Sequence, residues 1–169
     1  MRSNVPDLAI SVRRAQPSDA LAVAELINRA YAIEAFFVDG DRTHAGEIAE
    51  MMRTGTFVVL EGDAGLAAAV YVEARGYFGM LAVLPGLQGM GLGKRLVRIA
   101  EAMCEAQGVT TMNLRIINLR EELARWYRSL GYHAVGTAPY NHRPVKQPCH
   151  FIDMQRSLAV DSTRPQIAA

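Results

Sequence analysis

The stretch Gln88-Gly89-Met90-Gly91-Leu92-Gly93-Lys94-Arg95 (QGMGLGKR) places a glycine at every second position and two cations directly after the last glycine. Glycine has no Cβ atom, so it adopts backbone dihedrals that other residues avoid and lets a ligand approach the main chain, at a cost in folding entropy. The stretch lies between an apolar run at 77–83 and a segment whose apolar residues recur at helical spacing. The sequence therefore predicts a strand, a ligand-binding turn and the start of a helix.

The expected helix start makes this turn a candidate anion site. The first N–H groups of a helix have no partner within it, and they lie at the positive end of the helix dipole, where phosphate groups commonly bind. The N–H groups from Gly89 to Gly93 would face a phosphate or pyrophosphate, with Lys94 or Arg95 adding positive charge at the rim.

Spacing separates three kinds of anion-binding turn. A P-loop requires a glycine at position 88 and a hydroxyl residue at position 95, where this chain has Gln88 and Arg95. The dinucleotide fingerprint GxGxxG fails as well, because Lys94 and Leu96 stand where its third glycine would be. The remaining pattern is Gln-x-x-Gly-x-Gly, carried by Gln88, Gly91 and Gly93.

The rest of the chain alternates strand-like and helix-like segments. Strands are expected at 10–14, 56–60, 66–72, 77–83, 110–117, 133–137 and 149–158, and helices at 17–31, 45–53, 93–107 and 118–130. This order predicts an α/β fold, with a mixed sheet and helices on both of its faces. We expect a single domain over residues 1–158 and a loose tail over 159–169.

Composition limits the class of partner. The chain has 169 residues and a formal net charge of +1, without a long cationic run, which argues against nucleic acid or membrane surfaces as partners. Its N-terminus has no apolar signal region, and no segment reaches the roughly 18 to 20 apolar residues of a membrane span. Cys104 and Cys149 form no CxxC pair and favour a reducing compartment, so we expect a cytoplasmic protein. The four histidines have no regular ligand spacing, and no metal site is predicted.

The segment LAVLPGLQGMGLGKRL (81–96), followed by a helix, a strand and WYRSLGY (126–132), resembles the acetyl-coenzyme A (acetyl-CoA) binding core of the GCN5-related N-acetyltransferase (GNAT) family. The resemblance follows the element order from residue 10 to about 158 and is tightest over 81–132. It implies a GNAT-like, mostly antiparallel twisted sheet of about seven strands. In that family the glycine turn binds the coenzyme's pyrophosphate, and the preceding strand lies beside the pantetheine arm and receives the thioester carbonyl. The positions that match are Leu81, Ala82, Val83, Gln88, Gly89, Met90, Gly91, Leu92, Gly93 and Lys94.

The second part of the resemblance carries a catalytic residue. The segment 126–132 matches an aromatic-Tyr-x-x-x-Gly-aromatic ending in which the tyrosine contacts the cofactor and protonates the leaving thiolate, a role that falls on Tyr127. A phenol has a pKa of about 10 and a thiol of about 8.5, so a phenol beside the sulfur can donate a proton as charge develops there. Tyr127 also shares a helical face with Leu123 and Leu130, which is typical of a packed core aromatic.

Asn118 has two interpretations. The asparagine that usually starts this helix in the family sits two residues nearer to the tyrosine. Asn118 is therefore either a ligand to the pantetheine arm or the N-cap of the helix, with Glu121 at the third helical position.

Acetylation of an amine also requires a base, because a free alkylamine has a pKa of about 10 and is mostly protonated at neutral pH. We assign this role to Glu73, at the end of a strand, with Glu34, His133 and His142 as alternatives. In this family the acceptor pocket is built from the segments that correspond to 34–44 and 137–147. Their aromatic and acidic residues suit a cationic amine, whereas their arginines suit a carboxylate.

The resemblance implies an N-acetyltransferase that moves an acetyl group from acetyl-CoA to the primary amine of a small molecule, an amino acid or a peptide. Neither cysteine lies at the glycine turn, which favours direct attack in a ternary complex over an acetylated enzyme. The family often forms dimers, so a homodimer is possible. The alternatives are a non-catalytic acyl-CoA-binding sensor or regulatory module, and a phosphotransferase whose magnesium ligands the sequence does not supply.

Overall fold

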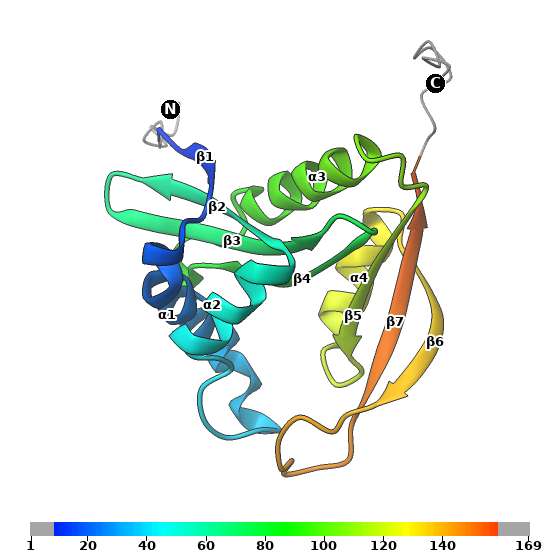
Figure 1. The fold of residues 1–169 in the computed structure, drawn as a ribbon. Coiled ribbons are helices and arrows are strands. Elements are labelled where there is room, and N and C mark those ends of the chain that lie inside the picture. The colour runs from blue at the N-terminus through cyan, green and yellow to red at the C-terminus, as the bar shows by residue number, and fades with distance from the viewer. Residues whose placement is uncertain (1–8, 159–169) are drawn as a thin grey trace, which may run out of the picture.

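The computed structural model describes residues 9–158, which form a seven-stranded mixed sheet with helices on both faces (Figure 1). The strands are β1 (Ser11–Arg14), β2 (Thr56–Gly62), β3 (Gly65–Glu73), β4 (Tyr77–Val83), β5 (Thr111–Ile117), β6 (His133–Pro139) and β7 (His150–Ser157). The α-helices are α1 (Ala20–Tyr31), α2 (Ala45–Thr54), α3 (Leu92–Glu105) and α4 (Glu121–Ser129). The predicted fold class is confirmed. The tail predicted at 159–169 lies outside the described residues, and the domain boundary at 158 stays a prediction.

The sheet divides between β4 and β5. The strand order is β1-β2-β3-β4-β5-β7-β6, and β4 and β5 form its parallel pair, whereas the other neighbours are antiparallel. β4 and β5 are in register at one position, Tyr77 with Asn113, while β5 pairs with β7 from Thr111 to Ile117. The two parallel strands therefore separate toward their carboxyl ends, as Figure 1 shows.

The part of the sheet before this division is covered on both faces. α1 and α2 pack on one face, and α3 packs on the other (Figure 1). The helical spacing predicted for α3 is confirmed, because Leu96, Val97, Ala100 and Cys104 are buried against the sheet. Burial of one large aliphatic side chain stabilises the fold by about 1.5 to 3 kcal/mol. This packing fixes the start of α3 at the end of β4.

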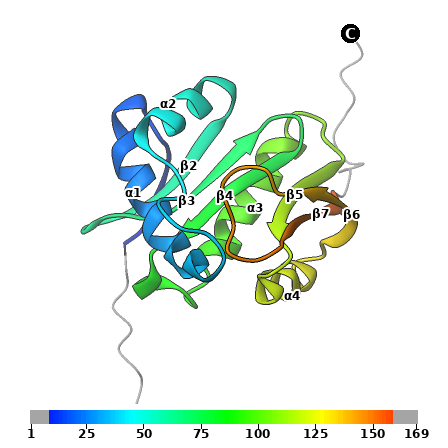
Figure 2. The ribbon, with the colours of Figure 1, turned by 90° about the horizontal axis from the view of Figure 1, so that it is seen from below.

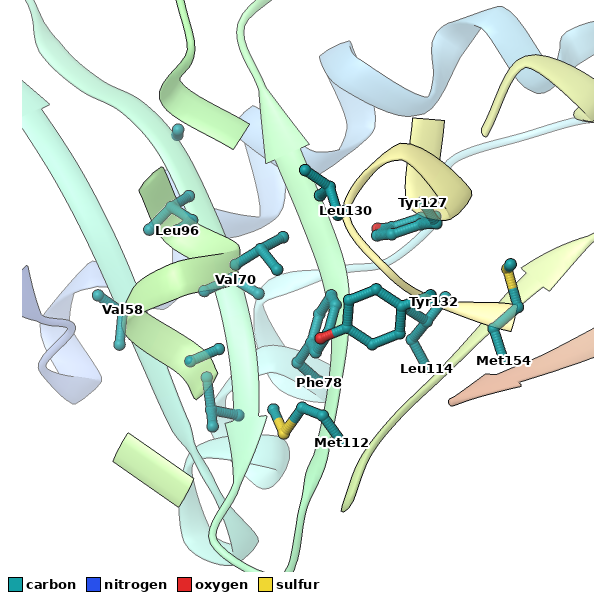
Figure 3. Close-up of a cluster of buried hydrophobic side chains, with 14 of the residues drawn as sticks. Val58, Val70, Phe78, Leu96, Met112, Leu114, Tyr127, Leu130, Tyr132 and Met154 are labelled. Atoms are coloured by element: carbon teal, nitrogen blue, oxygen red, sulfur yellow. The ribbon is translucent and has the colours of Figure 1, made fainter. Parts of the chain in front are cut away.

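α4 packs beside the division on the α3 side of the sheet. Its Tyr127 joins Tyr132 and Phe78 in one cluster, with ring centroids 5.9 to 6.1 Å from that of Tyr127 (Figure 3). Because Phe78 belongs to β4 and Tyr132 precedes β6, this cluster connects the two parts of the sheet.

A buried carboxylate connects the same two parts. Glu101 of α3 is 5% exposed, and it accepts hydrogen bonds from the Tyr132 hydroxyl (2.8 Å), from Arg156 of β7 (2.7 Å) and from Arg98 (2.8 Å). Burial acts to raise the pKa of Glu101, but the three hydrogen bonds outweigh it and lower that pKa below its usual range. The ionised Glu101 therefore joins the helix that follows the glycine turn to the strands beyond the division.

The prediction that Asn118 caps α4 is wrong. The helix begins at Glu121, and its N-cap position is Arg120. The Asn118 backbone N–H donates to the His150 carbonyl (3.0 Å), and the Asn118 side-chain oxygen accepts from the His150 N–H (2.8 Å). Asn118 thus continues the pairing between β5 and β7, and this uses the oxygen that a cap would need.

Within residues 9–158, no helix is both long enough and apolar enough to span a membrane.

Candidate active site

A bulge in β4 opens one side of the site. Ala82 pairs with Ala69 and Gly79 with Tyr71, so two β4 residues, Met80 and Leu81, stand opposite a single β3 residue. Met80 takes a positive φ of 50°, which is rare for a residue other than glycine. A bulge of this kind redirects the backbone. Because β5 has already separated, the β5-facing edge of β4 from Leu81 to Val83 has no neighbouring strand, and an extended ligand can bind its peptide groups.

The glycine turn follows directly. Gly89 and Gly91 have φ values of +78° and +81°, in the left-handed region that favours glycine, and Gly91 is the N-cap of α3. A Cβ at either position would meet no atom within 4 Å, so glycine is required there by backbone conformation and not by crowding. Gln88, Gly89, Met90, Gly91 and Lys94 are all exposed, whereas the Leu92 side chain is buried in the core.

The start of α3 has the features of an anion site. The first helical hydrogen bond runs from the Arg95 N–H to the Gly91 carbonyl (3.0 Å), so the N–H groups of residues 92–94 precede the bonded part of the helix. The first turn contains no acidic residue, and Lys94 and Arg95 are exposed beside it. The Gln88 amide donates to the Val83 carbonyl (3.4 Å) and ties the turn to the end of β4. These groups fit a pyrophosphate.

The two sequence motifs are in contact. A Cβ at Gly93 would lie 3.5 Å from the Trp126 ring and 3.7 Å from Val83, so the start of α3, the end of β4 and α4 meet at this glycine. The Trp126 ring is in turn 4.8 Å from the ring of Tyr127. The helix of Tyr127 therefore packs against the start of α3 and the end of β4.

Tyr127 is both packed and protonated. It is 5% exposed within the core cluster, as the packing interpretation predicts. Burial raises the pKa of Tyr127 well above its ordinary value, and the nearby Tyr31 and Tyr77 hydroxyls raise it further, while the Arg120 charge acts in the opposite direction. At neutral pH the Tyr127 hydroxyl therefore carries its proton.

A buried ion pair lies near this tyrosine. Glu34 belongs to a short 3-10 helix (Ala32–Phe36) after α1, and its carboxylate lies 3.2 Å from the Arg120 guanidinium. Glu34 is 8% exposed, and burial raises the pKa of its carboxyl, although the Arg120 charge partly offsets this. Arg120 also pairs with Glu122. Sequence reasoning missed Arg120, because a charged residue before a helix gives no sign of its burial.

Two further tyrosines surround the same space. The Tyr31 ring lies 5.7 Å from the Arg42 guanidinium carbon, and burial raises the pKa of Tyr31 to about 12. Tyr77 begins β4, and burial raises its pKa as well. Both Tyr31 and Tyr77 act to raise the pKa of Tyr127. Sequence analysis assigned both residues to apolar segments and missed this arrangement.

The two segments predicted to form the acceptor pocket do come together. Val38 and Val145 form a β-bridge, and the Lys146 N–H donates to the Phe37 carbonyl (2.8 Å). Figure 2 shows the β6–β7 connection, in orange, arching toward the segment between α1 and α2. The Arg143 guanidinium donates to three backbone carbonyls of that segment, those of Asp39, Gly40 and Asp41. We call this contact between 34–44 and 137–147 the clasp.

The other candidate bases lie farther out. The Glu73 carboxylate accepts a hydrogen bond from Arg75 (2.7 Å) and lines a surface hollow beside Tyr77. His133 is exposed at the start of β6. The His142 ring lies beside those of Tyr140 and Phe151, at 5.5 and 5.4 Å. No group of three or more metal-ligating side chains occurs among residues 9–158.

Comparison with protein families identifies this arrangement. The family profile of the acetyltransferase (GNAT) domain matches residues 32–158, which is most of the chain. The chain belongs to the GNAT family. No curated protein matches the chain in sequence.

Solved GNAT structures share the fold. The ribosomal-protein-S18-alanine N-acetyltransferase from Escherichia coli superimposes with a TM-score of 0.74 at 18% identity, covering 92% of this chain and 99% of that one. The yncA protein from Salmonella typhimurium, solved with its cofactor acetyl-CoA, gives 0.69 at 19% identity, with 95% and 99% covered. A GNAT-family acetyltransferase from Staphylococcus aureus gives 0.72 at 15% identity, with 89% and 100% covered. At these identities the likeness concerns the fold.

Proposed function

We propose that this GNAT protein transfers an acetyl group from acetyl-CoA to a primary amine of a small molecule, an amino acid or a peptide. The observation that carries the proposal is the contact of Gly93 with Trp126 and Val83, which joins the anion-binding turn, the open edge of β4 and the helix of Tyr127. The acetyl-CoA in the Salmonella typhimurium structure and the acceptor named for the Escherichia coli enzyme support acetyl-CoA as donor and an amine as acceptor.

In this proposal the coenzyme lies along the opening between β4 and β5. Its pyrophosphate binds the N–H groups of residues 89–94, with Gln88 holding the turn and Lys94 supplying charge. Its pantetheine arm pairs with the backbone of residues 81–83, where the bulge leaves peptide groups free. The Asn118 amide oxygen is bonded to β7, so any contact of Asn118 with the arm uses its amide N–H groups.

The proposed chemistry needs two proton transfers. The neutral amine attacks the thioester carbonyl, a C–N bond forms and the C–S bond breaks. The ammonium proton passes to a base, and Tyr127 gives its proton to the departing thiolate. A phenol whose pKa is raised by burial holds this proton until charge develops on the sulfur. We propose this direct route in the ternary complex, because neither cysteine lies at the glycine turn: Cys104 is buried in the core, and Cys149 directly precedes β7 and packs against the cluster of Phe37.

Two carboxylates compete for the role of base. Glu34 is 8% exposed, burial raises the pKa of its carboxyl, and it lies beside Arg120, the residue before the helix of Tyr127. Glu73, at the end of β3, is less buried than Glu34, and its carboxylate accepts from Arg75 at the surface. A base works best when its pKa approaches the working pH. We therefore propose Glu34 as the main acceptor of the proton, with Glu73 as the alternative.

Calorimetric titration with acetyl-CoA, alongside ATP with magnesium, tests the cofactor assignment. We expect saturable binding of one acetyl-CoA per chain, and thiol release when amines, amino acids or peptides are added. Binding without release for any acceptor would favour the sensor alternative. Tighter binding of ATP with magnesium than of acetyl-CoA would overturn the proposal in favour of a phosphotransferase.

The variants Glu34→Gln and Glu73→Gln separate the two bases. Loss of the proton acceptor should slow transfer by about 100-fold or more, because general base catalysis typically accelerates a reaction by at least that factor. We expect this loss for Glu34→Gln and a loss below tenfold for Glu73→Gln, measured as kcat with acetyl-CoA saturating. The reverse order would assign the base to Glu73.

A further inference from the structure

Arg42 differs from the other arginines around the acceptor end of the site. It is half-buried in the segment between α1 and α2, with its guanidinium carbon 5.7 Å from the centre of the Tyr31 ring. Arg120 nearby is paired with Glu34, and Arg143 donates to three carbonyls. Among residues 9–158, Arg42 has no carboxylate within ion-pair distance.

The positive charge of Arg42 affects the pKa values of ionisable groups around Tyr127. It acts to lower the pKa values of Tyr31, Glu34 and Tyr77, although burial raises them more strongly. Tyr31 and Tyr77 in turn raise the pKa of Tyr127. Arg42 directly follows residues 39–41, whose carbonyls accept from Arg143, so it belongs to the clasp and lies over the Tyr31 ring there.

Several guanidinium groups lie around Glu34. The guanidinium groups of Arg120, Arg42 and Arg143 each act to lower the pKa of Glu34, whose carboxylate is buried. A half-buried cation without an anion partner has lost hydration that no ion pair replaces. An anionic group on the acceptor would supply that pair.

We propose that Arg42 binds a carboxylate of the acceptor, so that the acceptor is a free amino acid or a similarly small amino carboxylate. This inference rests on the proposed transferase function and specifies its substrate class. Arg42 takes the carboxylate, while Glu34 faces the amine at the opposite end of the molecule. The site thus presents one positive and one negative side chain to a zwitterion.

The chemistry of the guanidinium favours a carboxylate. Its planar fork forms two parallel hydrogen bonds with a carboxylate, and stacking on an aromatic ring restricts its orientation. Tyr31 supplies that ring, and Tyr31 is itself largely removed from solvent. Ile33 and Phe36, on the same short helix as Glu34, are 59% and 47% exposed and offer apolar surface next to the charged groups. We therefore expect apolar or aromatic amino acids to be the better acceptors.

The test compares acids with their uncharged counterparts. The probes are the twenty L-amino acids, their C-terminal amides and the matching amines without the carboxyl group, each assayed for thiol release from acetyl-CoA. We expect kcat/KM to be about 10- to 100-fold higher for the best acid than for its amide, the range of a hydrogen bond to a charged group. Arg42→Gln should remove this preference, and Arg42→Lys should restore part of it.

Arg29→Gln is the matched control, because Arg29 is an exposed arginine on α1 and its removal makes the same change in net charge. It should keep the full preference for acids. Equal rates for acids and amides in the unaltered protein, or a preference that survives in Arg42→Gln, would overturn the inference and leave the transferase function standing. Acetyl-CoA binding without thiol release for any of these probes or for peptides would instead overturn the proposed function itself.

Discussion

The two ends of the candidate site are built in different ways. The cofactor end consists of consecutive residues, from the β4 bulge at Met80 through the glycine turn to the start of α3, and its binding groups belong to the backbone. The acceptor end consists of side chains from separate segments, with Glu34 and Arg42 between α1 and α2 and Arg120 before α4. The residues of the cofactor end are neighbours in the sequence, whereas those of the acceptor end come together only when the chain folds.

This difference has a functional consequence. Backbone N–H groups recognise a phosphate whatever side chains surround them, so the cofactor end suits a ligand that stays the same. Side chains on connections can change without disturbing the sheet, so the acceptor end suits a ligand that differs between relatives. Tyr127 lies where the two ends meet, and the largest effect is expected there.

Replacing Tyr127 with Phe tests whether this residue, between the cofactor end and the acceptor end, donates the proton to the leaving thiolate. The ring keeps its packing with Phe78 and Trp126 but loses the proton donor. We expect kcat to fall by about 10² to 10⁴, the range of general acid catalysis, and the affinity for acetyl-CoA to change little. Thiol-release kinetics and calorimetry measure the two quantities. Unchanged kcat would remove the acid role and leave Tyr127 as a core residue.

Gly91→Val tests the cofactor end. A valine at φ +81° is strained by about 1 to 3 kcal/mol, and relief of that strain rearranges the N–H groups of the turn. We expect acetyl-CoA affinity to fall by about 5- to 150-fold, the same free energy expressed as a dissociation constant. Gly86→Ala is the control, since it lies in the same loop without a positive φ and with open space around it. Equal affinities of the two variants would contradict a backbone-built site.

The sequence predicted most of the fold and located the glycine turn between β4 and α3 for the same reason. Alternation and helical spacing are local patterns, and so is the glycine turn. The N-cap interpretation of Asn118 was wrong because an asparagine followed by a glutamate suits a helix start, while the pairing with His150 depends on a strand more than 30 residues later. The contact of Asn118 with the pantetheine arm stays a prediction. The burial of Glu34 and Arg120 also depends on residues far apart in the chain, and no local pattern carries it.

Glu101→Gln tests the connection between the two parts of the sheet. The neutral amide keeps one acceptor but weakens the hydrogen bonds from Arg98, Arg156 and Tyr132, so we expect the free energy of unfolding to fall by about 2 kcal/mol. Chemical denaturation at neutral pH measures this difference. An effect within about 0.5 kcal/mol, as for an ordinary surface substitution, would contradict a structural role.

The ionisation of Glu101 also predicts how the free energy of unfolding depends on pH. The pKa of Glu101 is lower in the folded protein than its ordinary value of 4.5, so the folded state favours the ionised form. Its contribution is therefore complete above that ordinary value and is lost as the pH falls through the lower, folded-state pKa. We expect the stabilities of the unaltered protein and Glu101→Gln to converge below pH 4.5, and a constant difference down to the acid transition would contradict the assignment.

Arg143→Gln gives the smallest expected effect and tests the acceptor end alone. Arg143 donates to three carbonyls across the clasp but is partly exposed, so its loss should cost about 0.5 to 1.5 kcal/mol of local order, the net value of an ordinary hydrogen bond. Because the clasp carries Arg42 and lies next to Glu34, we expect KM for the acceptor to rise about two- to tenfold, the same free energy, with acetyl-CoA affinity unchanged. Arg53→Gln, which removes an exposed arginine paired only with Glu50, should change neither. If Arg143→Gln weakens acetyl-CoA binding as much as acceptor binding, the two ends are not separate, and the clasp also orders the cofactor turn.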